Sequence, residues 1–114
     1  MHSNVPHFLF AGVTAVSFMT AVSVFGQEDL SLEKRGEAPL ATNCSRCHAI
    51  GRTGASPHSS APAFRTLSSK YPIEGLAEAL AEGFSVGHPD MPEFVFEPDE
   101  IAGILAYLKS IQER

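Results

Sequence analysis

The pentapeptide Cys44-Ser45-Arg46-Cys47-His48 restricts this chain more than any other segment. Two thiols three positions apart, followed directly by an imidazole, form the attachment signature of a c-type haem. On a helical turn the two thiols point the same way and can add to the two vinyl groups on one edge of a porphyrin. His48 then lies beneath the ring, where one of its nitrogens can reach the iron as the proximal ligand. The pentapeptide therefore predicts one covalently attached haem c, with its iron, per chain.

Two other kinds of site use the same cysteine spacing, and each needs a further feature. A zinc site needs additional Cys or His ligands at matching spacing, and the chain has only 2 cysteines. A thioredoxin-like redox pair is expected beside a βαβ pattern, which the sequence does not show. A structural disulfide between Cys44 and Cys47 would close a very short loop and stabilise little. Haem attachment is the interpretation that the residues favour.

An uncharged segment lies near the N-terminus. From Phe8 to Phe25 the chain carries no charged residue, and charges begin only at Glu28. This pattern predicts an export signal. The few residues before it include no Lys or Arg, so an uncleaved membrane anchor over residues 8–25 remains an alternative. In either case we expect the domain to be exported to the periplasm, because haem and reduced thiols meet outside the cytoplasm for covalent attachment.

The small residue Gly26 suits signal-peptidase cleavage before Gln27. This divides the chain into a signal peptide, residues 1–26, and a domain, residues 27–114. The domain carries all the charged residues, 8 Lys+Arg and 13 Asp+Glu, for a net charge of -5. A negative balance argues against a nucleic-acid partner and favours a protein with a basic docking patch. A domain this small usually needs a stabilising group besides its apolar core, and a covalently held haem at the centre of the core would supply it.

The segment around the pentapeptide predicts a helix followed by a loop. We expect the first helix over Asp29–Cys47, with Ser31 as its N-cap. Pro39 lies within it and predicts a kink or a break, because proline removes a hydrogen bond and clashes with the preceding turn. Residues Ala49–Ala61 are rich in Gly, Ser and Pro and predict a loop. We interpret His58 in this loop as a solvated side chain and not as an iron ligand.

Two short elements are expected next. The segment Pro62–Leu67 predicts a short helix or turn, with Phe64 and Leu67 facing inward. The segment Ile73–Glu82 predicts a clearer helix, because its apolar residues recur at helical spacing. Gly83 suits the position directly after the end of that helix.

The strongest secondary-structure pattern is a last helix that begins at Pro98. Asp99 and Glu100 fill its first turn, where negative charge is favourable. Its apolar residues form one continuous face: Ile101, Ile104, Leu105, Leu108 and Ile111. No period-2 strand and no internal repeat is visible. The sequence therefore predicts an all-α domain, with about three to five short helices around a haem.

The order of these elements resembles class I cytochrome c, of the small monohaem type found in the bacterial periplasm. The resemblance covers residues 28–113 and adds a Met-Pro pair in an irregular segment before the last helix. It implies that the sulfur of Met91 is the distal iron ligand. It also implies that the carbonyl of Pro62 accepts the second ring N–H of His48, which would fix the orientation of that ligand.

The resemblance further implies that the first and last helices cross. Gly36 and Leu40 on the first helix, with Gly103 and Tyr107 on the last, match the positions of that crossing. The chain departs from the family in one respect, because the ring of docking lysines of some members is absent. Its lysines are Lys34, Lys70 and Lys109.

The distal ligand can also be considered from the residues alone. A thioether is a soft, neutral donor that favours reduced iron, so ligation by Met91 raises the reduction potential. Met91 could instead simply fill core, as most methionines do. His88, three residues away, is the rival ligand and would lower the potential. The Met-Pro context and the family resemblance favour Met91.

The resemblance implies a function. Two axial ligands leave no open position on the iron, so we expect a single-electron carrier and not an enzyme. Its partners would be redox proteins, a dehydrogenase or an oxidase, and we expect a monomer. Two alternatives stay open: a small haem peroxidase or gas sensor with an open distal site, and a haem-bearing subunit of a larger oxidoreductase complex. Arg46, Arg52 and Arg65 are candidate partners of the haem propionates, or ordinary solvated charges.

Overall fold

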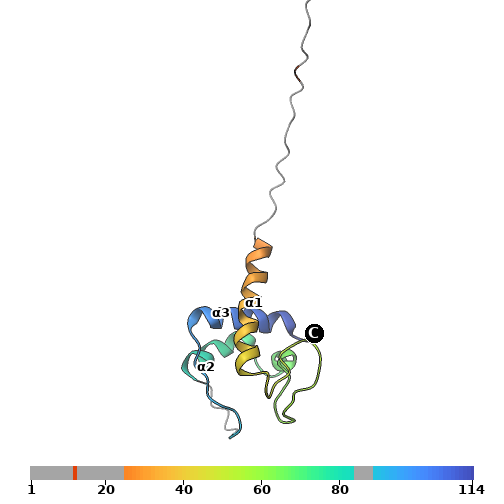
Figure 1. Ribbon diagram of the computed structural model, residues 1–114, viewed down its shortest axis with the longest axis vertical. Helices are drawn as coiled ribbons and strands as arrows, with labels where there is room; N and C mark the ends of the chain where they lie inside the picture. The colour runs from red at the N-terminus through yellow and green to blue at the C-terminus, as the bar shows by residue number, and fades with distance from the viewer. Residues whose placement is uncertain (1–11, 13–24, 84–88) are drawn as a thin grey trace, which may run out of the picture.

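The structure of the protein is a computed structural model. It describes residue 12, residues 25–83 and residues 89–114, and from Ser31 onward it also describes their side chains. Its elements in chain order are α1 (Phe25–Asn43), η1 (Phe64–Ser69), η2 (Ile73–Gly75), α2 (Leu76–Glu82) and α3 (Pro98–Ile111). No strand occurs in these described ranges, and the expected all-α class is confirmed (Figure 1). The predicted signal peptide falls mostly outside the described residues, and its cleavage stays a prediction. No helix in the described part is long and apolar enough to span a bilayer.

Helix α1 spans Phe25–Asn43, whereas the sequence predicted a helix over Asp29–Cys47. It starts at Phe25, so Ser31 lies inside the helix and the predicted N-cap there is wrong. It also runs through Pro39 without a break, so the predicted break is wrong, while a kink at this residue stays a prediction. Proline costs α1 one backbone hydrogen bond, but the next residue, Leu40, is only 2% exposed and belongs to the core. Packing of this apolar face stabilises the helix across the proline, as tertiary contacts commonly override local propensity.

The crossing of α1 and α3 is the most extensive contact between described elements. In Figure 1, α1 passes across α3 near the middle of both helices. At the crossing, a Cβ atom on Gly36 would collide with the carbonyl of Gly103, and one on Gly103 would lie 2.9 Å from the Gly36 nitrogen. Both residues are buried. The expected crossing is confirmed, and only glycine permits so close an approach of the two backbones.

The remaining elements follow the sequence predictions closely. Helix α3 starts at Pro98, and Glu97 and Glu100 form a reciprocal capping box at its start. Helix α2 ends at Glu82 and is followed, as predicted, by Gly83, whose positive φ of 96° is a conformation that favours glycine. Residues 49–61 form no helix or strand. The buried core gathers apolar residues from α1, η1, η2, α3 and the segment before α3: Leu40, Phe64, Leu67, Ile73, Phe96, Ile101, Ile104, Leu108 and Ile111.

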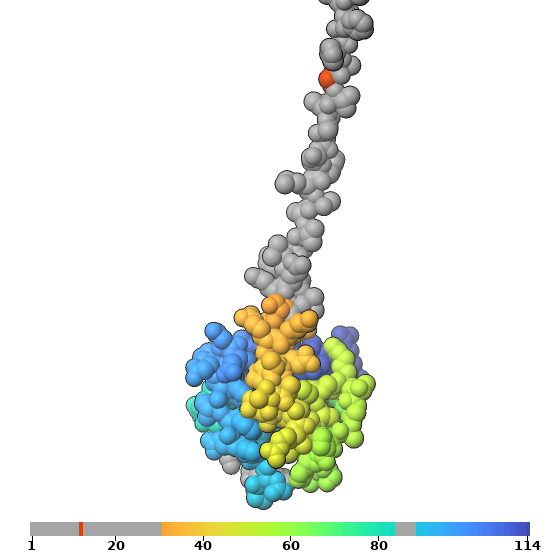
Figure 2. Space-filling view, viewed as in Figure 1, coloured from red at the N-terminus to blue at the C-terminus, as the bar shows by residue number. Residues whose placement is uncertain are grey.

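One face of the molecule shows how these parts surround α1. In Figure 2, α1 runs from orange to yellow between the segment that follows residue 89, in blue, and the loop that follows the pentapeptide, in green. The C-terminal end of α1 therefore lies between two irregular segments. One of them carries Met91, and the other carries His58 and Pro62.

Candidate haem site

A cavity of about 470 Å³ lies at the C-terminal end of α1. Five residues predicted to hold haem line it together: Cys44, Cys47, His48, Pro62 and Met91. The volume falls within the usual range of small-molecule sites. Most of the wall is apolar, contributed by Leu40, Phe64, Leu67, Leu76, Leu80, Phe94, Phe96, Ile104 and Leu108. The fold thus brings the predicted site residues to one largely apolar chamber.

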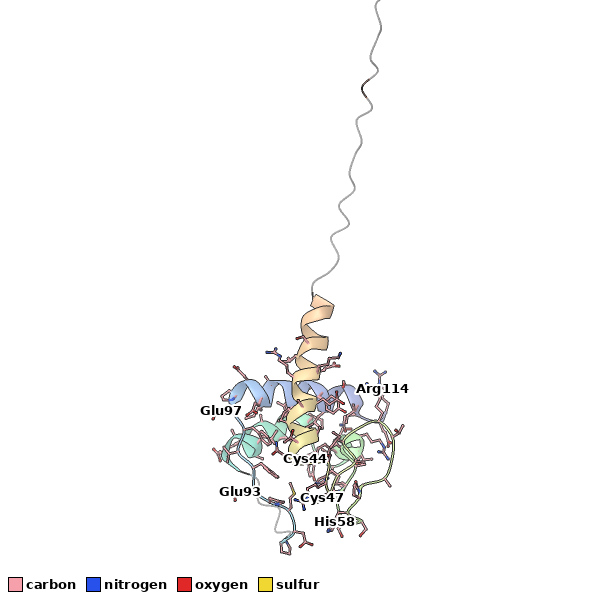
Figure 3. The ribbon with its side chains drawn as sticks, in the orientation of Figure 1. Cys44, Cys47, His58, Glu93, Glu97 and Arg114 are labelled. Atoms are coloured by element: carbon pink, nitrogen blue, oxygen red, sulfur yellow. The ribbon has the colours of Figure 1, made fainter. Side chains whose placement is uncertain are left out.

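The two cysteines lie on a turn that continues α1. The amide of Cys44 donates to the carbonyl of Leu40 at 2.8 Å, and the amide of His48 donates to the carbonyl of Cys44 at 2.9 Å. Both cysteines are free thiols that border the cavity, and Figure 3 shows them just below the end of α1. Burial, and secondarily the nearby Cys47, raises the pKa of Cys44 to about 11. The Cys44 thiol is therefore neutral at physiological pH.

His48 has one ring nitrogen engaged with the protein. Its Nδ1 lies 2.7 Å from the carbonyl oxygen of Pro62, which is the contact that the family resemblance implied. Because a carbonyl only accepts, Nδ1 carries the proton and donates, and Nε2 is left with its lone pair. The ring of Phe64 packs against the imidazole, with ring centroids 4.7 Å apart. The side chain is thus oriented to offer Nε2 as a metal ligand.

Met91 lies in the irregular segment between α2 and α3. Its side chain is half-buried and lines the cavity. Five residues after Met91, this segment is hydrogen-bonded to α2, because the amide of Phe96 donates to the carbonyl of Leu80 at 2.9 Å. The Glu93 side chain lies against Gly83, in space that a Cβ there would need. His88, the rival ligand, falls outside the described residues, so the choice of Met91 over it stays a prediction.

His58 is a partly solvated residue of the loop, and it also makes two polar contacts beside the cavity. It lines the cavity with its side chain 35% exposed, and its Nε2 lies 3.5 Å from Oδ2 of Asp90. The amide of Ser60 donates to its Nδ1 at 3.2 Å, so the proton resides on Nε2, facing Asp90. With both ring nitrogens engaged, His58 is not poised to bind iron. It connects the loop after the pentapeptide to the segment that carries Met91.

The candidate propionate partners differ from those chosen from the sequence. Arg46, Arg52 and Arg65 do not line the cavity, and Arg65 instead forms an ion pair with Glu113 at 2.9 Å. Among the described lining residues, Lys70 is the cation, and Tyr71 beside it is 42% exposed. Nothing in the local pattern between η1 and η2 distinguished these two residues. Their position at the cavity emerges only from the fold.

The donor set fits a covalently held haem. Two thiols on one turn, an imidazole with one free nitrogen, a thioether and an apolar wall are the groups that such a cofactor uses. Cys44 and Cys47 would hold its edge, His48 and Met91 would bind its iron, and Lys70 with Tyr71 could meet the negative propionates.

Comparison with protein families agrees with this geometry. The family model for cytochrome c matches residues 33–112, a span that contains the pentapeptide, Pro62 and Met91. Comparisons with curated proteins and with solved structures find no match. The family match covers well over half of the chain and implies covalently bound haem c and haem-based electron transfer. The chain belongs to the cytochrome c family.

Proposed function

We propose that this protein is a single-electron carrier with one haem c per chain, and not an enzyme. The observation that supports this most directly is that His48 and Met91, an imidazole and a thioether that would both hold a haem iron, line the same cavity. When bound, the haem supplies reversible one-electron chemistry between ferric and ferrous iron. An iron ligated on both sides has no open position for a substrate.

The chain's own residues would set the properties of that site. His48, with Nδ1–H donating to the Pro62 carbonyl, is a more basic ligand than a free imidazole. Met91 would favour the reduced iron and raise the reduction potential. The apolar wall would keep water from the cofactor, so that little reorganisation accompanies each electron transfer. Cys44 and Cys47 would hold the haem covalently, and Lys70 would offset propionate charge.

The proposed setting is the periplasm, reached through the uncharged segment that ends near Gly26. The mature domain would be free if this segment is cleaved, or tethered if residues 8–25 stay as an anchor. Its partners would be redox proteins, a dehydrogenase as donor or an oxidase as acceptor, and no nucleic acid. The net charge of -5 supports docking against a basic patch, with an affinity that falls as salt rises. We propose a monomer.

The deciding experiment is the absorption spectrum of the protein produced with haem-attachment machinery. A ferric sulfur-to-iron charge-transfer band that persists in His88→Ala and is lost in Met91→Ala would establish ligation by Met91. A band that is absent from the wild type, with rapid carbon monoxide binding to the ferrous form, would favour the peroxidase or sensor alternative. Co-purification with a dehydrogenase or oxidase would favour a subunit of a larger complex. A protein without covalent haem would refute the proposal.

A further inference from the structure

We propose that Gln112, just beyond the end of α3, is a positioning residue for His48. It would act through η1, which separates the two residues in the fold. The inference rests on the proposed function, because it assigns to Gln112 an influence on the ligand that binds the haem iron. Its consequence is that the C-terminal end of the chain sets part of the reduction potential.

The side-chain amide of Gln112 is fully engaged with two elements. Its Nε2 donates to the carbonyl of Phe64 at 2.9 Å and to the carbonyl of Leu108 at 2.7 Å. Its Oε1 accepts from the amide of Ser68 at 2.8 Å. Phe64 and Ser68 lie at opposite ends of η1, while Leu108 lies in the last turn of α3. The Gln112 side chain therefore joins both ends of η1 to the last turn of α3.

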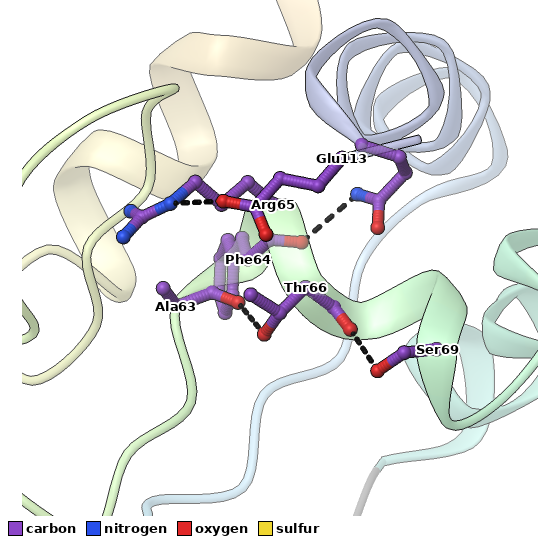
Figure 4. Close-up of polar contacts among 7 residues, drawn as sticks. Ala63, Phe64, Arg65, Thr66, Ser69 and Glu113 are labelled. Atoms are coloured by element: carbon purple, nitrogen blue, oxygen red, sulfur yellow. Dashed lines mark hydrogen bonds and ion pairs between the residues drawn. The ribbon is translucent and has the colours of Figure 1, made fainter.

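The next residue, Glu113, adds two contacts to the same element. Its amide donates to the carbonyl of Arg65 at 2.9 Å, and its Oε1 accepts from Nε of Arg65 at 2.9 Å. The Arg65 side chain is only 19% exposed. Figure 4 shows the contacts of Phe64 and Arg65 together with the hydrogen bonds that join Thr66 to Ala63 and to Ser69. The C-terminal residues thus hold η1 mainly through its backbone, with one additional contact to the Arg65 side chain.

The opposite side of η1 holds the proximal histidine. The amide of Phe64 donates to the carbonyl of Ala49 at 2.9 Å, directly after His48 in the chain. The Phe64 ring packs on the imidazole, and the carbonyl of Pro62 accepts from its Nδ1 at 2.7 Å. The N–H of Phe64 therefore faces the histidine segment while its C=O faces Gln112. Displacing η1 from the C-terminal end would loosen every one of these contacts with His48.

The chemical effect of such loosening has a definite direction. The bond from Nδ1–H to the Pro62 carbonyl makes His48 a stronger donor, which favours ferric iron. A longer or intermittent bond makes His48 a weaker donor, which favours ferrous iron and raises the potential. A residue with a merely structural role would change the free energy of unfolding without changing the potential.

The test compares two variants of the haem-loaded full chain. Gln112→Met keeps the size of the side chain but removes its hydrogen bonds to η1. Lys109→Met is the matched control, because Lys109 ties the same helix to η2 through Glu74 at 2.7 Å and does not touch the histidine segment. We measure the reduction potential, the unfolding free energy, and the solvent exchange rate of the His48 Nδ1 proton in the ferrous protein. Gln112→Glu, which keeps the acceptor for Ser68, is the second variant for the exchange measurement if Gln112→Met fails to fold.

We expect Gln112→Met to raise the potential and to speed exchange of the Nδ1 proton at least fivefold, with less than a twofold change in Lys109→Met. An unchanged potential and exchange rate, with lower stability alone, would overturn the inference. A lower potential would also overturn it, because that sign indicates water reaching the haem. A wild-type protein without covalent haem would refute the proposed function and this inference together, whereas a loaded protein with an unaffected His48 would refute only the inference.

Discussion

The two walls of the cavity are built differently. On the proximal wall, His48 itself is held by a 2.7 Å hydrogen bond to Pro62 and by the ring of Phe64. On the distal wall, the nearest side-chain contact described beside Met91 is the one between Asp90 Oδ2 and His58 Nε2 at 3.5 Å, and the Asp90 side chain is 68% exposed. Proximal contacts are short and shielded, while the distal one is long and solvated. If His48 and Met91 are the iron ligands, as proposed, we expect the methionine to be the one that exchanges more readily.

The largest effect is expected from removing a proximal contact. Phe64→Ala would delete a ring that is 9% exposed and packs on His48, and should lower the free energy of unfolding by about 3 kcal/mol. Denaturant unfolding of the haem-loaded protein measures this cost. A loss below about 1 kcal/mol would show that the proximal wall is no more tightly packed than the distal one.

The second effect concerns ligand exchange at Met91. Met91→Ala should keep covalent haem, lower the potential and cost about 2 kcal/mol of stability, because its side chain is only half-buried. The ferric variant should bind added imidazole far more tightly than the wild type, as titration by absorbance would show. Equal imidazole affinity in the two proteins would mean that Met91 does not occupy the iron.

A smaller effect is expected from the contact between His58 and Asp90, which both line the cavity. A double-mutant cycle with His58→Asn and Asp90→Asn should give a coupling of about 0.2–1 kcal/mol, since both groups are partly solvated. The coupling is measured from the unfolding free energies of the four loaded proteins. A value above about 2 kcal/mol would contradict the contrast between the walls, because the distal segment would then be firmly held.

The smallest effect lies outside both walls and serves as a reference. A hydrogen bond from Lys109 lowers the pKa of Glu74 below its ordinary value of 4.5. The folded carboxyl therefore stays charged to lower pH than the unfolded one, and its contribution is present above pH 4.5 and lost as the pH falls through the folded value. The melting temperature of wild type should drop slightly more between pH 6 and pH 3 than that of Glu74→Gln, under otherwise identical conditions. Parallel curves would show that this exposed pair adds nothing.

The sequence predicted those features that depend on neighbours in the chain. The attachment pentapeptide is a local motif, and the start of α3 follows from Pro98 and the acidic residues after it. The inward positions of Phe64 and Leu67 were also correct, because apolar residues at that spacing share one side of a short helical turn. In each case the physical cause lies within one or two turns of chain.

The features that sequence reasoning missed depend on contacts between distant segments. Pro39 remains helical because the surrounding turn packs into the core. His58 contacts Asp90 on the other irregular segment, and Gln112 donates a hydrogen bond to Phe64, which lies 48 positions earlier in the chain. Lys70 reaches the cavity only after η1 and α2 have been placed. No periodicity or capping pattern carries such information, because none of these partners is local.

The close approach of Gly36 and Gly103 also bears on the order of folding events. Gly36 lies in α1 and its counterpart Gly103 in α3, so the crossing joins two segments that are far apart in the sequence. Contacts between such distant segments are slow to form, since a long loop must close first. Until then the pentapeptide that follows α1 has no α3 against which to bury. We therefore expect the Gly36–Gly103 crossing to form late in folding, which would keep both thiols accessible for covalent attachment until the cavity closes.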